Sequence, residues 1–366
     1  METLTFRRDL SQQPKSETER AEILANPGFG NYFTDHTAVV DYSVDAQGEG
    51  SWHDARIEPY GPIALDPSAA VLHYGQEIFE GLKAYRHADG SVWTFRPEAN
   101  AARLNTSARR LALPELPASV FLDALRELVS VDAAWVPTGD GEALYLRPFM
   151  IATEPFLGVR PAREVSFRVI ASPAGNYFGG ELHPVSIWLS EHYARAGRGG
   201  TGEAKCGGNY AASLAAQLEA EAQGCQQVLF LDQFNDNAVD ELGGMNVFFV
   251  FKDGRIVTPE LNGNILHGVT RSSVLEIAKE RGLHAEERKI TLQEWKDSVA
   301  DGSLAEVFAC GTAAVITPIG ELKTSTGSIV TPAAEGEPHW KAIRAELLGI
   351  QTGTVEDTRC WLTRLV

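Results

Sequence analysis

A single lysine between two glycine clusters is the residue of this 366-residue chain best suited to chemistry. From Gly199 the sequence runs Gly-Gly-Thr-Gly-Glu-Ala-Lys205-Cys-Gly-Gly-Asn-Tyr210. Glycine has no Cβ, so the backbone on both sides of the lysine can approach a bulky group closely. Burial or a neighbouring cation lowers the pKa of a lysine and frees its amine as a nucleophile. The pattern therefore permits a lysine that bonds to an aldehyde, and a solvated lysine in a flexible loop is the simpler alternative.

An aldehyde cofactor such as pyridoxal phosphate also needs a phosphate site. Thr270 stands two residues after Gly268, at the start of an expected helix, where free N–H groups and the helix dipole attract anions. Thr312, after Gly311, is a second candidate. Arg103 borders the apolar face of another expected helix, where an arginine needs an anionic partner. The alternatives are an ordinary helix start, a β-bulge and an ion pair within the protein.

The cofactor ring would need two further partners, a carboxylate at its nitrogen and a donor at its oxygen. Glu241 stands beside a glycine pair, which would let a flat ring lie against the backbone. Tyr210 is the hydroxyl donor nearest to the lysine in sequence. A surface glutamate before a turn and a tyrosine packed at a helix start are the alternatives.

Composition and missing motifs exclude several functional classes. Lysine and arginine number 32 against 49 aspartates and glutamates, a net charge of −17, which disfavours nucleic acid and anionic membranes as partners. The sequence contains no run of eighteen apolar residues, no secretory signal, no CxxC pair and no histidines at ligand spacing. The glycine-rich signatures of nucleotide sites and the serine elbow of hydrolases are also missing. We expect a cytoplasmic protein with free thiols and without a metal.

The length predicts two domains. Residues 172–184 contain two prolines and three glycines, so we place a linker at 174–184, between a smaller domain 1–173 and a larger domain 185–366 that carries the lysine. Strands are expected in groups, with helices between them and without strict βαβ alternation. This order predicts a mixed α/β (α+β) fold and not a doubly wound sheet.

The elements that must position these residues follow from apolar periodicity and from capping signals. Helices are expected from Pro97, at 118–131, at 211–222, at 269–281 and at 338–348. Strands are expected at 143–152, at 227–232 and at 306–318, the last interrupted by Gly311. Thr291 and Glu294 predict a capping box, and residues 1–28 are expected to be poorly structured.

Together these motifs resemble the fold-type IV pyridoxal-phosphate enzymes, and most closely the branched-chain amino acid aminotransferases. The resemblance extends through almost the whole chain, and its landmarks occur in the family order. These landmarks are Phe29-Gly, Phe33-Thr-Asp-His36, Phe79-Glu-Gly-Leu-Lys83, Tyr145-Leu-Arg147, Lys205-Cys-Gly-Gly-Asn-Tyr210, Glu241 to Asn246, Gly268-Val-Thr-Arg271 and Gly311-Thr-Ala313.

The resemblance implies a role for each landmark residue. Lys205 would be the Schiff-base lysine and proton shuttle, with Glu241 at the ring nitrogen and Tyr210 at the ring oxygen of pyridoxal phosphate, which would lie at the domain interface. The implied phosphate ligands and the arginine near the cofactor are Arg103, Val269, Thr270, Thr312 and Arg195. The implied substrate pocket consists of Phe29, Tyr74, Tyr145, Arg147, Tyr177, Gly244, Thr312 and Ala313. Gly244 replaces a threonine of some relatives, which removes one hydrogen bond to substrate.

The implied activity is reversible transamination of leucine, isoleucine or valine with 2-oxoglutarate, by a ping-pong mechanism in a homodimer that shares pocket residues around Tyr74. Aromatic rings suit the branched side chains, and Arg147 suits the carboxylate of glutamate. A D-amino acid aminotransferase and an aminodeoxychorismate lyase are the alternatives within the superfamily. A lysine aldolase without cofactor and a catalytically silent dimeric binding protein are more distant alternatives.

Overall fold

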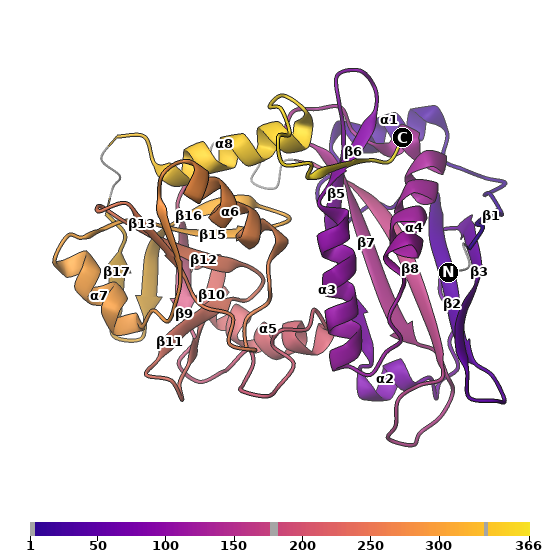
Figure 1. The fold of residues 1–366 in the computed structure, drawn as a ribbon, viewed down its shortest axis with the longest axis horizontal. Coiled ribbons are helices and arrows are strands. Elements are labelled where there is room, and N and C mark those ends of the chain that lie inside the picture. The colour runs from indigo at the N-terminus through magenta and orange to yellow at the C-terminus, as the bar shows by residue number, and fades with distance from the viewer. Residues whose placement is uncertain (1–3, 176–181, 333–335) are drawn as a thin grey trace. The chain divides into compact units, whose positions relative to one another are not determined.

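A computed structural model describes residues 4–175, 182–332 and 336–366 of the chain. The chain divides into two compact units. The first consists of Met1–Gly179, Ala204–Gly207 and Ile350–Val366, and the second of Gly180–Glu203 and Gly208–Gly349. Each unit contains a large sheet together with helices (Figure 1), so the prediction of a mixed α/β fold is confirmed.

The first unit contains a nine-stranded sheet that is mostly antiparallel. Its strand order is β1 (Arg7–Arg8), β3 (Gly50–Pro59), β2 (His36–Val44), β8 (Glu164–Ala174), β7 (Ala143–Ala152), β5 (Leu82–Arg86), β6 (Val92–Phe95) and β18 (Leu362–Arg364), with β4 (Glu77–Phe79) paired to β7. Helices α3 (Pro97–Arg110) and α4 (Ala118–Val131) pack against this sheet and each other (Figure 1). Two short helices, α1 (Glu17–Ala25) and α2 (Ala70–Tyr74), complete the unit.

The second unit contains another nine-stranded sheet, of mixed direction. Its order is β11 (Ala238–Leu242), β10 (Gln227–Asp232), β9 (Val185–Leu189), β16 (Val315–Thr324), β15 (Leu304–Gly311), β12 (Asn246–Phe251), β13 (Arg255–Thr258) and β14 (His284–Glu287), with β17 (Gly327–Val330) paired to β16. The helices are α5 (Gly207–Ala222), α6 (Val269–Glu280), α7 (Leu292–Ala300) and α8 (His339–Thr352). Trp295 of α7 packs edge-on against Phe249 of β12, with ring centroids 5.0 Å apart.

Several local predictions were wrong. The first 28 residues were expected to be poorly structured, but they contain β1 and α1. Helix α1 begins with a capping box between Ser16 and Glu19, in a polar stretch of sequence that did not suggest a helix. Residues 306–318 are not one interrupted strand, because β15 and β16 form an antiparallel hairpin that turns after Gly311. At α7, only half of the predicted capping box forms: the Glu294 N–H donates to the Thr291 hydroxyl, whereas the Glu294 carboxylate pairs with Arg288.

The division into units differs from the predicted domains in two places, and the boundaries at 173/174 and 184/185 stay predictions. Ile350–Val366 groups with the first unit because β18 pairs with β6. Ala204–Gly207, which includes the lysine, also groups with the first unit. In the part of the chain that the structure describes, every helix is too short or too polar to cross a membrane.

Helix α4 supplies a test of the first core. Leu125 is completely buried on its apolar face, whereas Leu218 of α5 is 67% exposed. Leu125→Ala should lower the free energy of unfolding by about 2–5 kcal/mol, because it leaves a cavity in a close-packed core. Urea denaturation followed by circular dichroism measures this loss. Leu218→Ala is the matched control, and an equal effect of both substitutions would contradict the burial pattern.

Candidate active site

The backbone of Lys205 is held by the first unit. Its N–H donates to the Ser107 hydroxyl of α3 at 2.8 Å, and its carbonyl accepts the N–H of Phe79 in β4 at 2.9 Å. Two residues later, the Gly207 N–H donates to the Glu77 carboxylate. These bonds from two different elements show that Lys205 does not belong to a loosely solvated loop.

The residues that flank this segment are tied together within the second unit. The Thr201 hydroxyl donates to Asn209 Oδ1 at 2.7 Å, and Asn209 Nδ2 donates to the Thr201 carbonyl at 2.7 Å. The lysine therefore lies in a loop whose two ends are joined by side-chain hydrogen bonds.

The amine of Lys205 has an environment that favours its neutral form. Its pKa is lowered to about 8, first by burial and then by the positive charge of Arg103. The charge of Arg147 lowers this pKa less, and the negative charge of Glu80 raises it. The Nζ atom lies 4.7 Å from the centroid of the Phe79 ring. Near neutral pH a much larger fraction of this amine is unprotonated than of an exposed lysine, as a nucleophile or a general base requires.

Arg103 forms the ion pair that the sequence left open as the alternative to phosphate binding. Its Nε and Nη2 donate to the two oxygens of Glu80 at 2.8 and 2.7 Å. Asn100 Nδ2 also donates to Glu80, at 2.8 Å, and Glu80 is completely buried. One edge of the guanidinium is therefore occupied by Glu80.

Aromatic rings and a second arginine gather beside this pair. The Phe29 and Tyr145 rings meet edge to face at 5.1 Å, and Arg147 Nη2 donates to the Tyr145 hydroxyl at 3.0 Å. The Arg147 guanidinium lies 4.8 Å from the centroid of the Phe79 ring. Arg147 Nε is buried and has no hydrogen-bond partner in the described part of the chain. Aromatic rings beside a buried arginine suit a ligand that has both a carboxylate and an apolar side chain.

In the second unit, Glu241 is buried instead of lying on the surface. It is 2% exposed, and its Oε1 lies 2.7 Å from Arg195 Nη1. The Leu266 N–H donates to the same oxygen at 2.9 Å, and Asn246 Nδ2 donates to Oε2 at 3.2 Å. The carboxylate is thus fixed by one cation and two neutral donors.

Helix α6 begins close to this carboxylate. Its N-cap residue is Gly268, which supplies no side-chain cap, and Val269 and Thr270 are buried in the first turn. A Cβ on Gly268 would overlap the Oδ1 of Asn246, the residue that also donates to Glu241. A helix start without a side-chain cap is suited to an anion.

The remaining predicted residues lie in both units. Tyr210 lies in the first turn of α5, and a Cβ on Gly244 would lie 3.9 Å from its Cε1 atom. Thr312 and Ala313 lie in the turn between β15 and β16. Tyr74, 42% exposed at the end of α2 in the first unit, donates its hydroxyl to the Leu157 carbonyl. The prediction for Tyr177 falls outside the described residues.

The predicted residues therefore form two groups, one in each unit. The first unit brings together Phe29, Arg103, Tyr145, Arg147 and Lys205. The second unit contains Arg195, Tyr210, Glu241, Gly244, Val269, Thr270, Thr312 and Ala313.

Sequence reasoning assigned no role to Glu77, Phe79, Glu80 or Ser107, which surround Lys205 in the structure. Phe79 and Glu80 belong to a quoted landmark motif, so their proximity to the lysine could have been suspected. Ser107 carries only a weak signal, its position four residues after Arg103 on the same helix.

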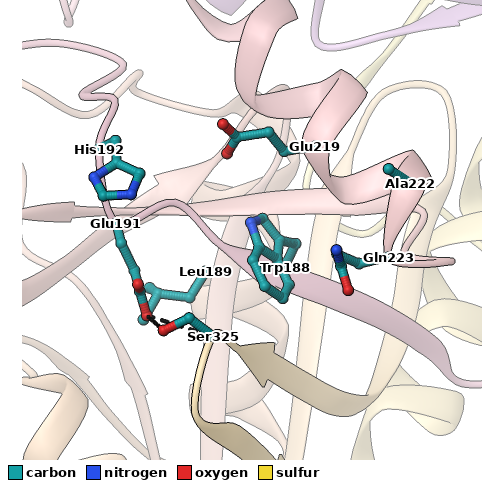
Figure 2. Close-up of a pocket in the computed structure, with 8 residues that line it drawn as sticks. All are labelled: Trp188, Leu189, Glu191, His192, Glu219, Ala222, Gln223 and Ser325. Atoms are coloured by element: carbon teal, nitrogen blue, oxygen red, sulfur yellow. Dashed lines mark hydrogen bonds between the residues drawn. The ribbon is translucent and has the colours of Figure 1, made fainter.

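A hollow of about 270 Å³ in the second unit contains none of the predicted site residues (Figure 2). Trp188, Glu191, His192 and Glu219 are among the residues that line it, and Glu191 accepts a hydrogen bond from the Ser325 hydroxyl at 2.8 Å. Among the described residues, no lysine or arginine lines this hollow, whereas the carboxylates of Glu191 and Glu219 do. The hollow is therefore unsuited to a phosphate.

The lowered pKa of Lys205 predicts its reactivity in the absence of cofactor. Because burial and Arg103 lower that pKa to about 8, acetylation of Lys205 by acetic anhydride should reach half its maximal rate near pH 8. Exposed lysines should reach this point above about pH 10. Peptide mass spectrometry after competitive labelling measures each midpoint, and a midpoint for Lys205 equal to those of surface lysines would refute the expected environment.

The chain is similar to known aminotransferases. A sequence model described as Amino-transferase class IV matches residues 77–322. The chain is 57% identical to a branched-chain-amino-acid aminotransferase of Mycolicibacterium smegmatis, over 99% of this chain and 98% of that protein. It is 56% identical to the Mycobacterium tuberculosis (strain H37Rv) protein of the same name, over 96% of both.

Solved structures with the same fold include branched-chain amino acid aminotransferases. The Escherichia coli enzyme superposes with a TM-score of 0.73 at 26% identity, over 91% of this chain and 99% of that one. The enzyme from the thermophilic archaeon Thermoproteus uzoniensis, solved with norvaline, gives 0.72 at 26% identity, over 90% of this chain and 100% of that one. The chain belongs to the class IV aminotransferase family.

Proposed function

We propose that this chain is a branched-chain-amino-acid aminotransferase that uses pyridoxal 5′-phosphate to exchange amino groups between leucine, isoleucine or valine and 2-oxoglutarate. The observation that carries the proposal is the placement of Lys205 in a chain of this family: Ser107 and Phe79 hold its backbone, and its Nζ lies 4.7 Å from the centroid of the Phe79 ring. The names of the relatives at 56–57% identity support the substrate class. Neighbouring structures with pyridoxamine 5′-phosphate and with N-(5′-phosphopyridoxyl)-L-glutamate support the cofactor and glutamate as the second substrate.

The residues of both units fit the proposed cofactor. The uncapped start of α6, with Val269 and Thr270, suits its phosphate, to which Arg103 and Thr312 would add donors. The buried Glu241 suits the ring nitrogen, and Tyr210 suits the ring oxygen. When bound, the cofactor supplies an electron sink that acidifies the Cα proton of the amino acid.

The proton transfer falls to Lys205. Its amine, whose neutral form is favoured by burial and by Arg103, would accept the Cα proton at Nζ and deliver it again on the same face of the substrate. Arg195 and Asn246 would hold the Glu241 carboxylate in position while the charge on the ring changes. Exclusion of water by Phe79 and the surrounding rings would strengthen each of these electrostatic interactions.

The aromatic rings and Arg147 of the first unit offer a reason why one pocket would accept both branched-chain amino acids and glutamate. Phe29, Phe79 and Tyr145 present apolar surface to a branched side chain. Arg147, whose Nε is buried without a described partner, would pair with the side-chain carboxylate when glutamate occupies the same place. Tyr74, Tyr177, Gly244 and Ala313 complete the proposed pocket.

A homodimer is part of the proposal. Apolar side chains gather on two neighbouring segments of the first unit, and a second copy would cover them. These side chains are Leu72, 57% exposed, Tyr74, 42%, Leu157, 64%, and Val159, 89%. Light scattering should then give a mass twice the 39.8 kDa of the chain. The cytoplasmic location stays a prediction.

The proposed activity is tested by a substrate panel. The purified protein should be yellow and should form glutamate from 2-oxoglutarate with L-leucine, L-isoleucine or L-valine. Initial rates at several fixed concentrations of each substrate should give the parallel reciprocal plots of ping-pong kinetics. D-amino acids in the same panel distinguish a D-amino acid aminotransferase, and turnover only with those would contradict the proposal.

Replacement of the lysine tests its role directly. Lys205→Ala should lower kcat by at least about 10²–10⁴-fold, because it removes the general base and the nucleophile together. Single-turnover mixing with L-leucine measures the rate. Lys252→Ala, at an exposed lysine in the turn between β12 and β13, is the control and should keep full activity. Equal rates for both variants would remove Lys205 from the mechanism.

A further inference from the structure

We infer that Ser107 and Glu77 are positioning residues that set the place of the Lys205 amine relative to Arg103. Their side chains bind the backbone on either side of the lysine: the Lys205 N–H donates to Ser107 Oγ at 2.8 Å, and the Gly207 N–H donates to the Glu77 carboxylate. The kinetic part of this inference depends on the proposed function, whereas its structural part does not.

The lysine segment needs such anchors because so little of it belongs to the first unit. Only Ala204–Gly207 groups there, and the chain on both sides belongs to the second unit. Within these four residues, a backbone bond to the sheet runs from Phe79 N to Lys205 O. Ser107 and Glu77 add two side-chain bonds to this one, so removal of either should loosen the lysine.

Ser107 also connects the lysine to the neighbouring arginine. Arg103 and Ser107 are one helical turn apart on α3, about 6 Å at 1.5 Å per residue, and both are buried on the same side of the helix. Arg103 lowers the pKa of Lys205 by its charge, and Ser107 holds the lysine backbone. The rigid helix therefore fixes the distance between the candidate phosphate ligand and the reactive lysine.

Glu77 binds the segment on the C-terminal side of Lys205, at Gly207. Its carboxylate is partly buried, and this burial raises its pKa, while the Gly207 N–H and the charge of Arg147 favour its ionised form. A Cβ on residue 207 would overlap the Glu77 Oε1 atom, so a larger residue there would displace the Glu77 carboxylate. A partly buried carboxylate that accepts a backbone N–H two residues after Lys205 is suited to fix the position of the lysine segment.

The experiment compares four substitutions in the full chain with the wild-type protein. Ser107→Ala removes the first anchor, and Thr106→Ala is its control, because it removes a hydroxyl from the adjacent residue that bonds to its own helix at Ala102 O. Glu77→Ala removes the second anchor, whereas Glu77→Gln keeps an oxygen for the Gly207 N–H. Circular dichroism verifies the fold of each variant.

Two readouts separate positioning from general stability. Ser107→Ala and Glu77→Ala should lower kcat for L-leucine by about 10–100-fold, because a displacement of about 1 Å of a reacting group costs this much. The cofactor dissociation constant should change by less than about threefold. In cofactor-free protein, the pH midpoint of Lys205 acetylation should move upward, because greater exposure and greater distance from Arg103 both raise the pKa of the lysine.

Thr106→Ala and Glu77→Gln should stay within about threefold of the wild-type rate, with an unchanged acetylation midpoint. The inference is wrong if Ser107→Ala keeps both the rate and the midpoint of the wild type, or if Glu77→Gln behaves like Glu77→Ala. Should Ser107→Ala fail to fold, the two Glu77 variants decide the outcome. A wild-type protein inactive on every amino acid would refute the proposed function alone, and the acetylation midpoints would still test the anchors.

Discussion

The buried Arg103 close to the amine of Lys205 is the interaction on which the candidate site of the first unit depends. A guanidinium removed from water is costly unless a carboxylate pairs with it, and Glu80 supplies that carboxylate by two hydrogen bonds to Arg103. The pair allows Arg103 to remain buried beside Lys205 and to lower its pKa, while Glu80 opposes part of this effect. The reactivity of the lysine is therefore set by a balance of two opposite charges and by burial.

The second unit also contains a buried Arg–Glu pair, Arg195 with Glu241, in which the roles of the two residues are exchanged. There the functional candidate is the carboxylate, Glu241, and the arginine is its support. Asn246 donates to Glu241, and its Oδ1 would overlap a Cβ at Gly268, so Asn246 links the carboxylate to the start of α6. Each unit thus contains a buried Arg–Glu pair that includes a predicted cofactor-binding residue, Arg103 in the first unit and Glu241 in the second.

The path of the chain explains why the lysine can be held accurately within a segment of only four residues. Thr201 and Asn209 tie the flanking chain within the second unit, and Ser107, Phe79 and Glu77 bind the segment between them to the first. Gly207 contributes to this arrangement, because the absence of a Cβ lets the Glu77 carboxylate approach the backbone. A segment fixed at several points loses little conformational freedom when it reacts.

Local sequence signals determined the regular elements of the protein. Apolar periodicity predicted α4 with its observed bounds, and proline at the first helical position predicted the start of α3. The landmark motifs together indicated the family, because their residue types follow the chemistry of the cofactor and their order follows the fold. Signals failed where a local pattern was ambiguous, as at Gly311, where a hairpin turn resembled a break within one strand.

Tertiary structure alone decided what each candidate side chain touches. Glu80 and Arg103 are 23 residues apart, and Arg195 and Glu241 are 46 apart, so no short-range pattern could pair them. The sequence by itself identified the lysine, the glutamate and the arginines as reactive or charged groups. Only the fold decided which charges are buried together, because the cost of an unpaired buried charge depends on its surroundings in space and not on its position in the chain.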